Sequence, residues 1–226
     1  KEKAMADGRW ILVGEPTGMK LGIAQKGCLW LEISARGITS HGAYPKEGAN
    51  AVTCAVRIAE QVKAFVEQSS HPLLGSSTAQ ITMLEGGVAN NMTPDRCRVV
   101  MDIRMVPGMT SEMVMAKAKE ALLEEQKEDS RLEADFQALN DRRAIEIAED
   151  HPMTAGLGEK LCQAGYEKEV LGLNFFTDAS VLDRKGERDI LLFGPGDPSM
   201  AHKPNEYVEI GKYEDAIRIL QQFAKE

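Results

Sequence analysis

Residues 97–105, Cys-Arg-Val-Val-Met-Asp-Ile-Arg-Met, decide the fold of the middle of the chain. Apolar side chains occupy every second position from 97 to 105, and most of the positions between them are polar. This period of two predicts a strand with one buried face and one polar face. Similar alternation predicts three more strands, at 28–36, 79–83 and 132–138.

Helical periodicity separates these strands. From 49 to 66, apolar residues recur at intervals of three and four, which predicts an amphipathic helix. Thr110 is a favourable N-cap for a second helix, which we expect to run to about Glu125. The order strand, helix, strand, strand, helix, strand predicts a ferredoxin-like βαββαβ unit. Its helices would cover one face of the sheet, and its edge could pair with another copy.

The sequence on both sides of this unit has a different pattern. Residues 10–13 and 190–193 are short, continuous apolar runs, which are typical of buried strands in α/β sheets. A further strand is expected at 170–176, and helices are expected at 152–164 and 213–224. We therefore expect an α/β domain in two parts, 1–24 and 141–226, interrupted by the ferredoxin-like domain at 25–140. Because the two parts of the α/β domain contain few strands, we expect much of the sheet of that domain to be absent.

Composition limits the classes of function. The 226 residues carry a formal net charge of −8, which argues against a general nucleic-acid binder. No apolar run approaches the roughly 18 residues that a membrane span requires. The four cysteines form no C-x-x-C pair, which is typical of reduced thiols in a cytoplasmic protein. No signal peptide is visible, and since the first residue is not Met, we expect the natural start to be missing.

Three polar loops follow the strands predicted in the flanking parts: residues 14–17, 177–180 and 194–206. Ligands of open α/β sheets bind at the carboxyl ends of the strands, so we expect the three loops to converge on one edge. They carry Glu15, Asp178, His202 and Glu206. Carboxylates and imidazoles suit zinc, manganese or cobalt. From spacing alone, a solvated carboxylate at Glu15 and a surface histidine at His202 are the commoner alternatives.

The ferredoxin-like unit also contains candidate polar residues. His41 lies in a Ser-His-Gly-Ala segment that follows a predicted strand. Arg104 lies on the polar face of its strand, where its guanidinium could hold a carboxylate with two hydrogen bonds. The alternatives are a loop histidine and an exposed strand arginine without a ligand.

Eight segments, taken together and in this order, resemble one known family. They are Gly14-Glu15-Pro16-Thr17, Lys26-Gly27, Ser40-His41-Gly42-Ala43-Tyr44-Pro45, Gly86-Gly87-Val88-Ala89-Asn90-Asn91-Met92-Thr93-Pro94-Asp95, Asp102-Ile103-Arg104, Thr177-Asp178-Ala179, Gly194-Pro195-Gly196 and Ala201-His202-Lys203-Pro204-Asn205-Glu206. The series resembles the dinuclear-metal deacylases and exopeptidases. This family includes acetylornithine deacetylase, succinyl-diaminopimelate desuccinylase, aminoacylases and glutamate carboxypeptidase.

The resemblance implies a metal site and a dimer. Glu15 matches a ligand of one of two divalent ions and His202 a ligand of the other, the ions being zinc, or cobalt or manganese. His41 matches the histidine that, in the family's homodimers, reaches the partner subunit's site and stabilises the oxyanion. The domain at 25–140 matches the family's lid and dimerisation domain, inserted into a partial catalytic α/β domain.

The resemblance also implies a substrate-binding set. Asn91 and Arg104 match residues that hold the carboxylate end of the substrate. Thr177 and Gly196 lie on loops that line the substrate pocket. The implied substrate is an N-acyl amino acid or a dipeptide.

The implied reaction is metal-dependent hydrolysis of the amide bond of an N-acyl amino acid. A dipeptidase or carboxypeptidase of the same family and a non-catalytic, self-associating fragment are the alternatives. The family's first metal histidine, bridging aspartate and paired glutamates precede the Glu-Pro-Thr turn, and the residues before Glu15 do not supply them. We therefore expect the later part of a longer enzyme, with at most partial metal occupancy and no activity alone.

Overall fold

The computed structural model describes residues 10–183, 185–201 and 203–225, and the chain divides into two compact units. The inserted unit comprises Gly27–Ala144, and the flanking unit comprises Lys1–Lys26 together with Ile145–Glu226. Each unit has its own sheet and its own hydrophobic core. Within the described ranges, no helix is both long enough and apolar enough to cross a membrane.

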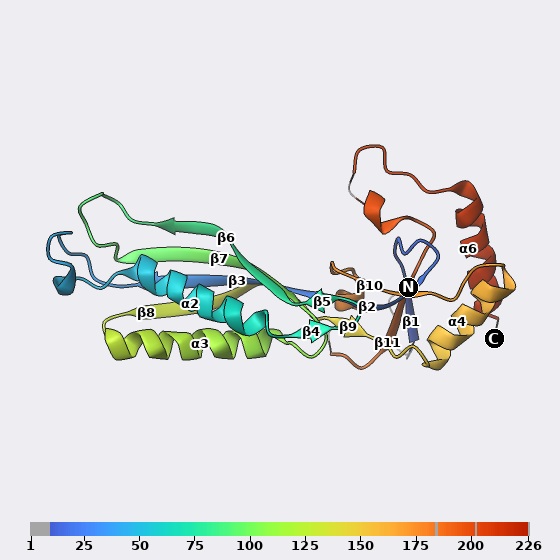
Figure 1. Ribbon diagram of the computed structural model, residues 1–226, viewed down its shortest axis with the longest axis horizontal. Helices are drawn as coiled ribbons and strands as arrows, with labels where there is room; N and C mark the ends of the chain where they lie inside the picture. The colour runs from blue at the N-terminus through green and yellow to red at the C-terminus, as the bar shows by residue number, and fades with distance from the viewer. Residues whose placement is uncertain (1–9, 184, 202, 226) are drawn as a thin grey trace. The chain divides into compact units, whose positions relative to one another are not determined.

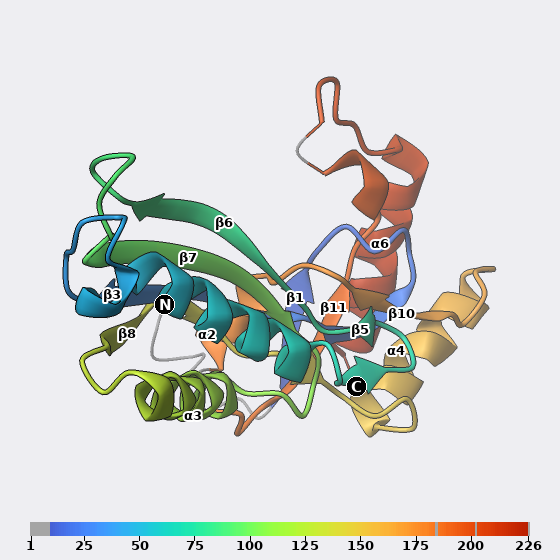
Figure 2. The same ribbon diagram turned by 60° about the vertical axis from the view of Figure 1, so that its left-hand side comes forward.

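The inserted unit is a four-stranded antiparallel sheet with two helices on one face (Figures 1 and 2). The elements, in chain order, are β3 (Gly27–Arg36), η1 (Pro45–Glu47), α2 (Ala51–Val66), β4 (Ser70–His71), β5 (Gly75–Ser76), β6 (Thr78–Gly86), β7 (Arg96–Met105), α3 (Ser111–Glu128) and β8 (Glu133–Arg142). The sheet order is β6-β7-β3-β8, and β4 pairs with β5 in a separate hairpin. This arrangement confirms the predicted βαββαβ fold.

The helices of the inserted unit begin at capping residues and pack through one apolar face. The Asn50 side chain accepts a hydrogen bond from the Thr53 N–H at the start of α2. The predicted cap Thr110 accepts one from the Met113 N–H at the start of α3, which satisfies an otherwise unpaired helix donor. The core between helices and sheet includes fully buried Leu31, Ile33, Ile58, Met101 and Ile103.

The prediction of a regular, half-buried strand at 79–83 is wrong in detail. Ala79 is buried, but the exposed fractions of Ile81 and Met83 are 40% and 48%. The register with β7 shifts between Ile81 and Met83, and β6 lies at the edge of the sheet. A bulge interrupts the alternation of faces, and an edge strand has a neighbouring strand on one side only.

The flanking unit contains a mixed sheet. Its elements are β1 (Trp10–Gly14), β2 (Leu21–Gln25), β9 (Ile145–Glu146), α4 (Pro152–Gln163), β10 (Val170–Leu173), α5 (Ala179–Leu182), β11 (Asp189–Phe193), η2 (Pro198–Met200) and α6 (Ile210–Phe223). The sheet order is β1-β11-β2-β10, with β9 paired to β2. Leu191 and Phe193 contribute to one core cluster, and Ile190 and Leu192 contribute to the other. Because successive side chains point to opposite faces, both faces of this sheet are buried.

The strand directions correct one expectation about this sheet. β1 and β11 are parallel, with Gly14 opposite Phe193, so the loops that follow them start at the same edge. β2 is antiparallel to β11 and β10 is parallel to β2, so β10 runs opposite to β1 and β11. The expectation that the loop after β10 starts at that same edge is therefore wrong. β2, a five-residue strand that is buried on both faces and has no alternation, was not predicted.

Candidate functional site

Two loops at the edge of the flanking unit's sheet, the one after β1 and the one after β11, are hydrogen-bonded to each other. The Met19 N–H donates to the Gly194 carbonyl at 2.9 Å, and the Gly18 N–H donates to the Gly196 carbonyl at 2.7 Å. The buried Thr17 hydroxyl donates to the Lys20 carbonyl at 2.6 Å and accepts from the Gly194 N–H at 3.0 Å. These bonds fix Glu15 and Gly196 on neighbouring turns.

Close packing explains the glycine at 194. A Cβ atom at this position would lie 2.5 Å from the Glu15 carbonyl oxygen, which is closer than real Cβ contacts. A larger residue would push the two loops apart. The Gly-Pro-Gly segment therefore owes its first glycine to the approach of the Glu15 backbone.

Glu15 carries a perturbed carboxyl group. It is half-buried, and burial is the main cause that raises its pKa above the ordinary value of 4.5. The negative charge of Asp178 is the second cause. The charge of Asp178 therefore acts on Glu15, even though the strand before Asp178 ends at the opposite edge. A carboxyl group whose ionised form is disfavoured in this way would be stabilised by a nearby cation.

Gln25 holds the turn that carries Asp178. Its side chain is fully buried, its Oε1 accepts from the Thr177 hydroxyl at 2.7 Å, and its Nε2 donates to the Ser180 hydroxyl at 2.9 Å. The Thr177 hydroxyl in turn accepts from the Ala179 N–H at 3.2 Å. Thr177 is thus a buried anchor of its turn. No local pattern singles out Gln25, because its partners lie more than 150 positions away.

An apolar hollow of about 370 Å³ lies beside Glu15. The turns at 14–16 and 194–196 form one wall, and Tyr213, Ile217 and Leu220 of α6 form another. The low polarity of these walls is consistent with the cost of burying the Glu15 charge.

In the inserted unit, the structure brings His41 and Asn91 together. The Gly42 N–H donates to the Asn91 carbonyl at 2.7 Å, and His41 forms an isolated β-bridge with Met92. Both His41 and Asn91 are exposed. Two candidate residues that lie 50 positions apart in the sequence therefore share one end of this unit.

The contacts of His41 select one ring nitrogen as a donor. Its Nδ1 lies 3.1 Å from the Ala43 backbone nitrogen and accepts that N–H. A neutral imidazole carries a single proton, so this geometry assigns it to Nε2. The Tyr44 ring lies beside the imidazole, with 5.9 Å between the ring centroids. His41 can therefore donate a hydrogen bond through Nε2 to a group outside its own loop.

Arg104 is engaged by a neighbour on its own strand. Its Nε and Nη2 donate to the two carboxylate oxygens of Asp102 at 2.6 and 2.9 Å. This ion pair raises the pKa of Arg104, chiefly through the hydrogen bond. Sequence reasoning expected the same bidentate geometry, but for the carboxylate of a substrate. A substrate carboxylate at Arg104 would have to share or displace Asp102.

The described residues do not assemble a metal-binding cluster. Nowhere in the described ranges does a group of three or more His, Cys, Asp and Glu side chains lie close enough to hold a metal ion. Glu15, with Asp178 near it, fits the role of a single carboxylate ligand. His202, the second predicted ligand, lies outside the described residues. No step through a metal ion follows from this arrangement.

Comparisons with known proteins agree with the two-unit architecture. Residues 23–130 match the family model described as "Peptidase dimerisation domain", of the M20 type. The chain is 28% identical over 225 residues to acetylornithine deacetylase of Myxococcus xanthus, covering 96% of this chain and 56% of that protein. It is 27% identical over 219 residues to a probable carboxypeptidase of Aspergillus flavus, covering 92% and 49%.

A solved structure shares the fold over almost the whole chain. The M20 family metallo-carboxypeptidase of Sulfolobus solfataricus matches with a TM-score of 0.68 at 18% identity, covering 99% of this chain and 65% of that one. The chain spans about half the length of the two curated relatives.

Proposed function

Because the chain belongs to the M20 peptidase family, carrying its dimerisation domain and part of its catalytic domain, we propose that it acts within a metal-dependent amide hydrolase. Enzymes of this family depend on metal ions. The proposed reaction removes the acyl group from an N-acyl amino acid, as in an acetylornithine deacetylase or a succinyl-diaminopimelate desuccinylase. The alignment of an acetylornithine deacetylase with 96% of the chain supports this reaction.

One observation carries this proposal. The parallel ends of β1 and β11 hold Glu15 at a sheet edge, half-buried and within the electrostatic range of Asp178. A carboxylate whose ionised form is disfavoured by burial and by a like charge is stabilised by a divalent cation. We propose that Glu15 binds one divalent ion at this edge and that His202 binds a second one. The ions are zinc, or cobalt or manganese.

We propose that His41 acts on the substrate bound to the partner subunit. An imidazole that accepts the Ala43 N–H at Nδ1 presents Nε2–H as its free donor. Such a donor can stabilise the negative charge that develops on a carbonyl oxygen during amide hydrolysis. Comparable oxyanion donors contribute roughly 10²–10³ in rate.

The remaining candidates would bind the substrate. We propose that Asn91 and Arg104 hold its carboxylate end, and that Thr177 and Gly196 shape the pocket on the flanking unit. Because Arg104 already forms an ion pair with Asp102, it would not supply an unshared positive charge. We propose that its role is to recognise the carboxylate end of the substrate.

We propose a homodimer formed through the inserted unit, for which the dimerisation-domain match is the main support. The edge strand β6 exposes Ile81, Met83 and Leu84. An edge strand offers unpaired N–H and C=O groups to a second copy. Isologous two-fold dimers are the commonest homo-oligomers.

A carboxypeptidase or dipeptidase of the same family is the second candidate. The alignment with a probable carboxypeptidase covers 92% of the chain, and Arg104 would serve a C-terminal carboxylate equally well. A panel of N-acyl amino acids and dipeptides, offered to an intact protein that includes this chain, separates the two. Faster turnover of dipeptides would replace the deacylase proposal.

Zinc titration of the 226-residue chain tests the metal role of Glu15. We expect weak binding of zinc that is lost in Glu15→Gln and retained in the control Glu159→Gln, an exposed position on α4. Equal binding by Glu15→Gln and the unchanged chain would refute it. We also expect no turnover of an N-acyl amino acid by this chain alone with zinc, cobalt or manganese. Metal-dependent turnover would refute the view that its site is partial.

A further inference from the structure

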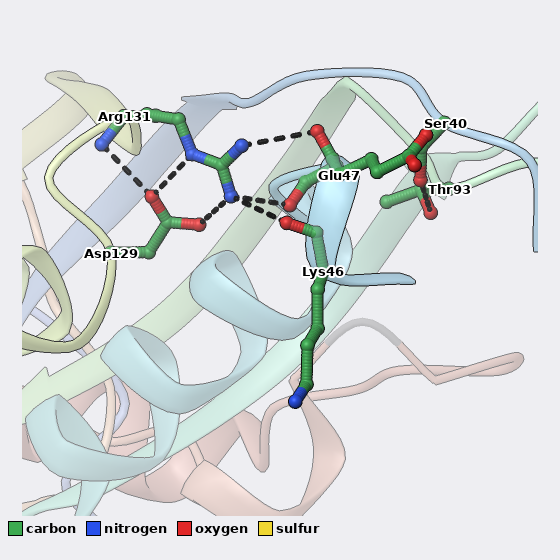
Figure 3. Close-up of polar contacts among 7 residues, drawn as sticks. Ser40, Lys46, Glu47, Thr93, Asp129 and Arg131 are labelled. Atoms are coloured by element: carbon green, nitrogen blue, oxygen red, sulfur yellow. Dashed lines mark hydrogen bonds and ion pairs between the residues drawn. The ribbon is translucent and has the colours of Figure 1, made fainter. Parts of the chain in front are cut away.

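Arg131 connects the turn between α3 and β8 to the loop that carries His41 (Figure 3). Its Nη1 donates to the Glu47 carbonyl at 3.0 Å. Its Nη2 donates to the Gly48 carbonyl at 2.7 Å and lies 3.5 Å from the Lys46 carbonyl. Three consecutive carbonyl groups of one loop therefore face a single guanidinium.

The receiving carbonyls belong to the end of a helical turn. η1 spans Pro45–Glu47, and the last carbonyls of any helix lack partners within that helix. A guanidinium supplies several N–H donors in one plane, whereas an ammonium is a compact point charge. The geometry at 46–48 therefore calls for arginine rather than for positive charge alone.

Asp129 holds the guanidinium in place. Nε and Nη2 of Arg131 donate to the two Asp129 oxygens, each at 2.8 Å, and the Arg131 backbone N–H donates to Asp129 at 3.1 Å. The pair also lowers the pKa of Asp129 and raises that of Arg131, in each case chiefly through their side-chain hydrogen bond. The side chain is thus oriented before it contacts the loop.

A chain of hydrogen bonds runs from Arg131 to His41. The His41 carbonyl accepts the Tyr44 N–H at 2.8 Å, the Tyr44 carbonyl accepts the Glu47 N–H at 3.0 Å, and the Glu47 carbonyl accepts from Arg131. On the other side of His41, the Ser40 and Thr93 hydroxyls form a hydrogen bond at 2.8 Å (Figure 3). His41 therefore lies in an exposed loop that is held by hydrogen bonds on both sides, at Ser40 and at Glu47.

We propose that Arg131 is a positioning residue for His41: by fixing the carbonyl end of the 45–48 turn, it fixes the backbone on which the imidazole is oriented. Its functional meaning rests on the proposed role of His41 at a substrate carbonyl. Arg131 itself does not contact the reacting group. Loss of the guanidinium hydrogen bonds lets the turns at 41–48 open, and the hydrogen bond from the Ala43 N–H to the His41 Nδ1 is then broken.

Nuclear magnetic resonance on the 226-residue chain tests this proposal without any measurement of turnover. In the unchanged chain, we expect the imidazole nitrogen shifts of His41 to report the Nε2–H form and the Tyr44 and Glu47 amides to exchange slowly. In Arg131→Lys, we expect a mixture of the two neutral ring forms and exchange of those amides faster by about tenfold. The matched control is Arg57→Lys, which alters an ion pair with Glu125 between α2 and α3 and touches no residue of the loop.

A second variant separates orientation from charge. Asp129→Asn keeps the Arg131 charge but weakens its anchor, so we expect a smaller change of the same kind. Unchanged His41 shifts and unchanged exchange in both variants would overturn the proposal. Because the readout is local structure, an absent hydrolase activity in an intact protein that includes this chain would refute the proposed function and leave this inference standing.

Discussion

The inserted unit is one continuous stretch of chain, whereas the flanking unit is assembled from segments on either side of it. One core cluster joins both helices of the inserted unit to its sheet. In the flanking unit, two smaller clusters lie on opposite faces of a mixed sheet. The first unit follows from local periodicity, whereas the second depends on long-range contacts such as that of Thr17 with Gly194. The two units should therefore respond differently to substitution.

The largest expected effect tests the independence of the inserted unit. Leu31 is fully buried in its core, so Leu31→Ala should destabilise this unit by about 3 kcal/mol. The two tryptophans are Trp10 in the flanking unit and Trp30 in the inserted unit. Urea unfolding followed by Trp30 fluorescence, in a Trp10→Phe background, measures the loss.

The reciprocal background, Trp30→Phe, provides the control for Leu31→Ala. The unfolding midpoint reported by Trp10 should stay where it is. A shift of both transitions by the same amount would show that the two units unfold as one.

The second effect should fall on the flanking unit. Gly194→Ala would place a methyl group 2.5 Å from the Glu15 carbonyl, which we expect to cost about 2 kcal/mol and to separate the two site loops. Gly14→Ala is the matched control, since no heavy atom lies within 4 Å of the position that its methyl group would take. Urea unfolding followed by Trp10 fluorescence should show a loss for Gly194→Ala alone. Equal midpoints for the two variants would contradict the close packing of Gly194 against the Glu15 backbone.

Local chemistry explains what the sequence could predict. Alternation at 97–105 requires no partner to be recognised, and Thr110 caps α3 through the Met113 N–H only three positions away. The strand before Glu15 and the strand before Gly194 were predicted from short, continuous apolar runs, which are also local patterns. The family resemblance assigned roles to the candidate residues, and these roles remain predictions.

Long-range geometry explains what the sequence could not predict. The direction of β10 depends on its pairing with β2, which has no alternation because both its faces are buried. The bulge after Ile81 depends on the register with β7. The contact of Gly42 with Asn91 and the bonds of Gln25 with Thr177 join residues that are distant in the chain. Such pairs leave no local pattern.

A smaller effect should come from the cap of α3. Thr110→Ala removes the acceptor of the Met113 N–H and should cost about 1 kcal/mol. The loss should appear in the Trp30 transition and not in the Trp10 transition. A Trp30 midpoint equal to that of the chain with Thr110 intact would mean that water replaces this cap without cost.

The smallest effect should depend on pH and concern Glu15. Because its folded pKa is raised, the folded state binds more protons than the unfolded state between the ordinary value of 4.5 and the folded value. Stability from this group therefore falls as pH rises through that window. A glutamine at this position does not titrate, so Glu15→Gln should be more stable than the unchanged chain at neutral pH. Below pH 4.5, this stability difference should disappear. Urea midpoints at both pH values, read from Trp10, measure this.

Asp178→Asn provides the comparison for Glu15→Gln. It should shift the midpoint at neutral pH in the same direction but by less, because burial outweighs the charge of Asp178 as a cause. A lower midpoint for Glu15→Gln at neutral pH would contradict the raised pKa.

We propose that the inserted unit is complete enough to associate by itself, whereas the flanking unit lacks some of the metal ligands. Light scattering of the 226-residue chain at micromolar concentration, with and without a chelator, tests this proposal. We expect a mass of twice 24.8 kDa that the chelator does not change. A mass of 24.8 kDa that does not rise with concentration, or a dimer that the chelator dissolves, would contradict it.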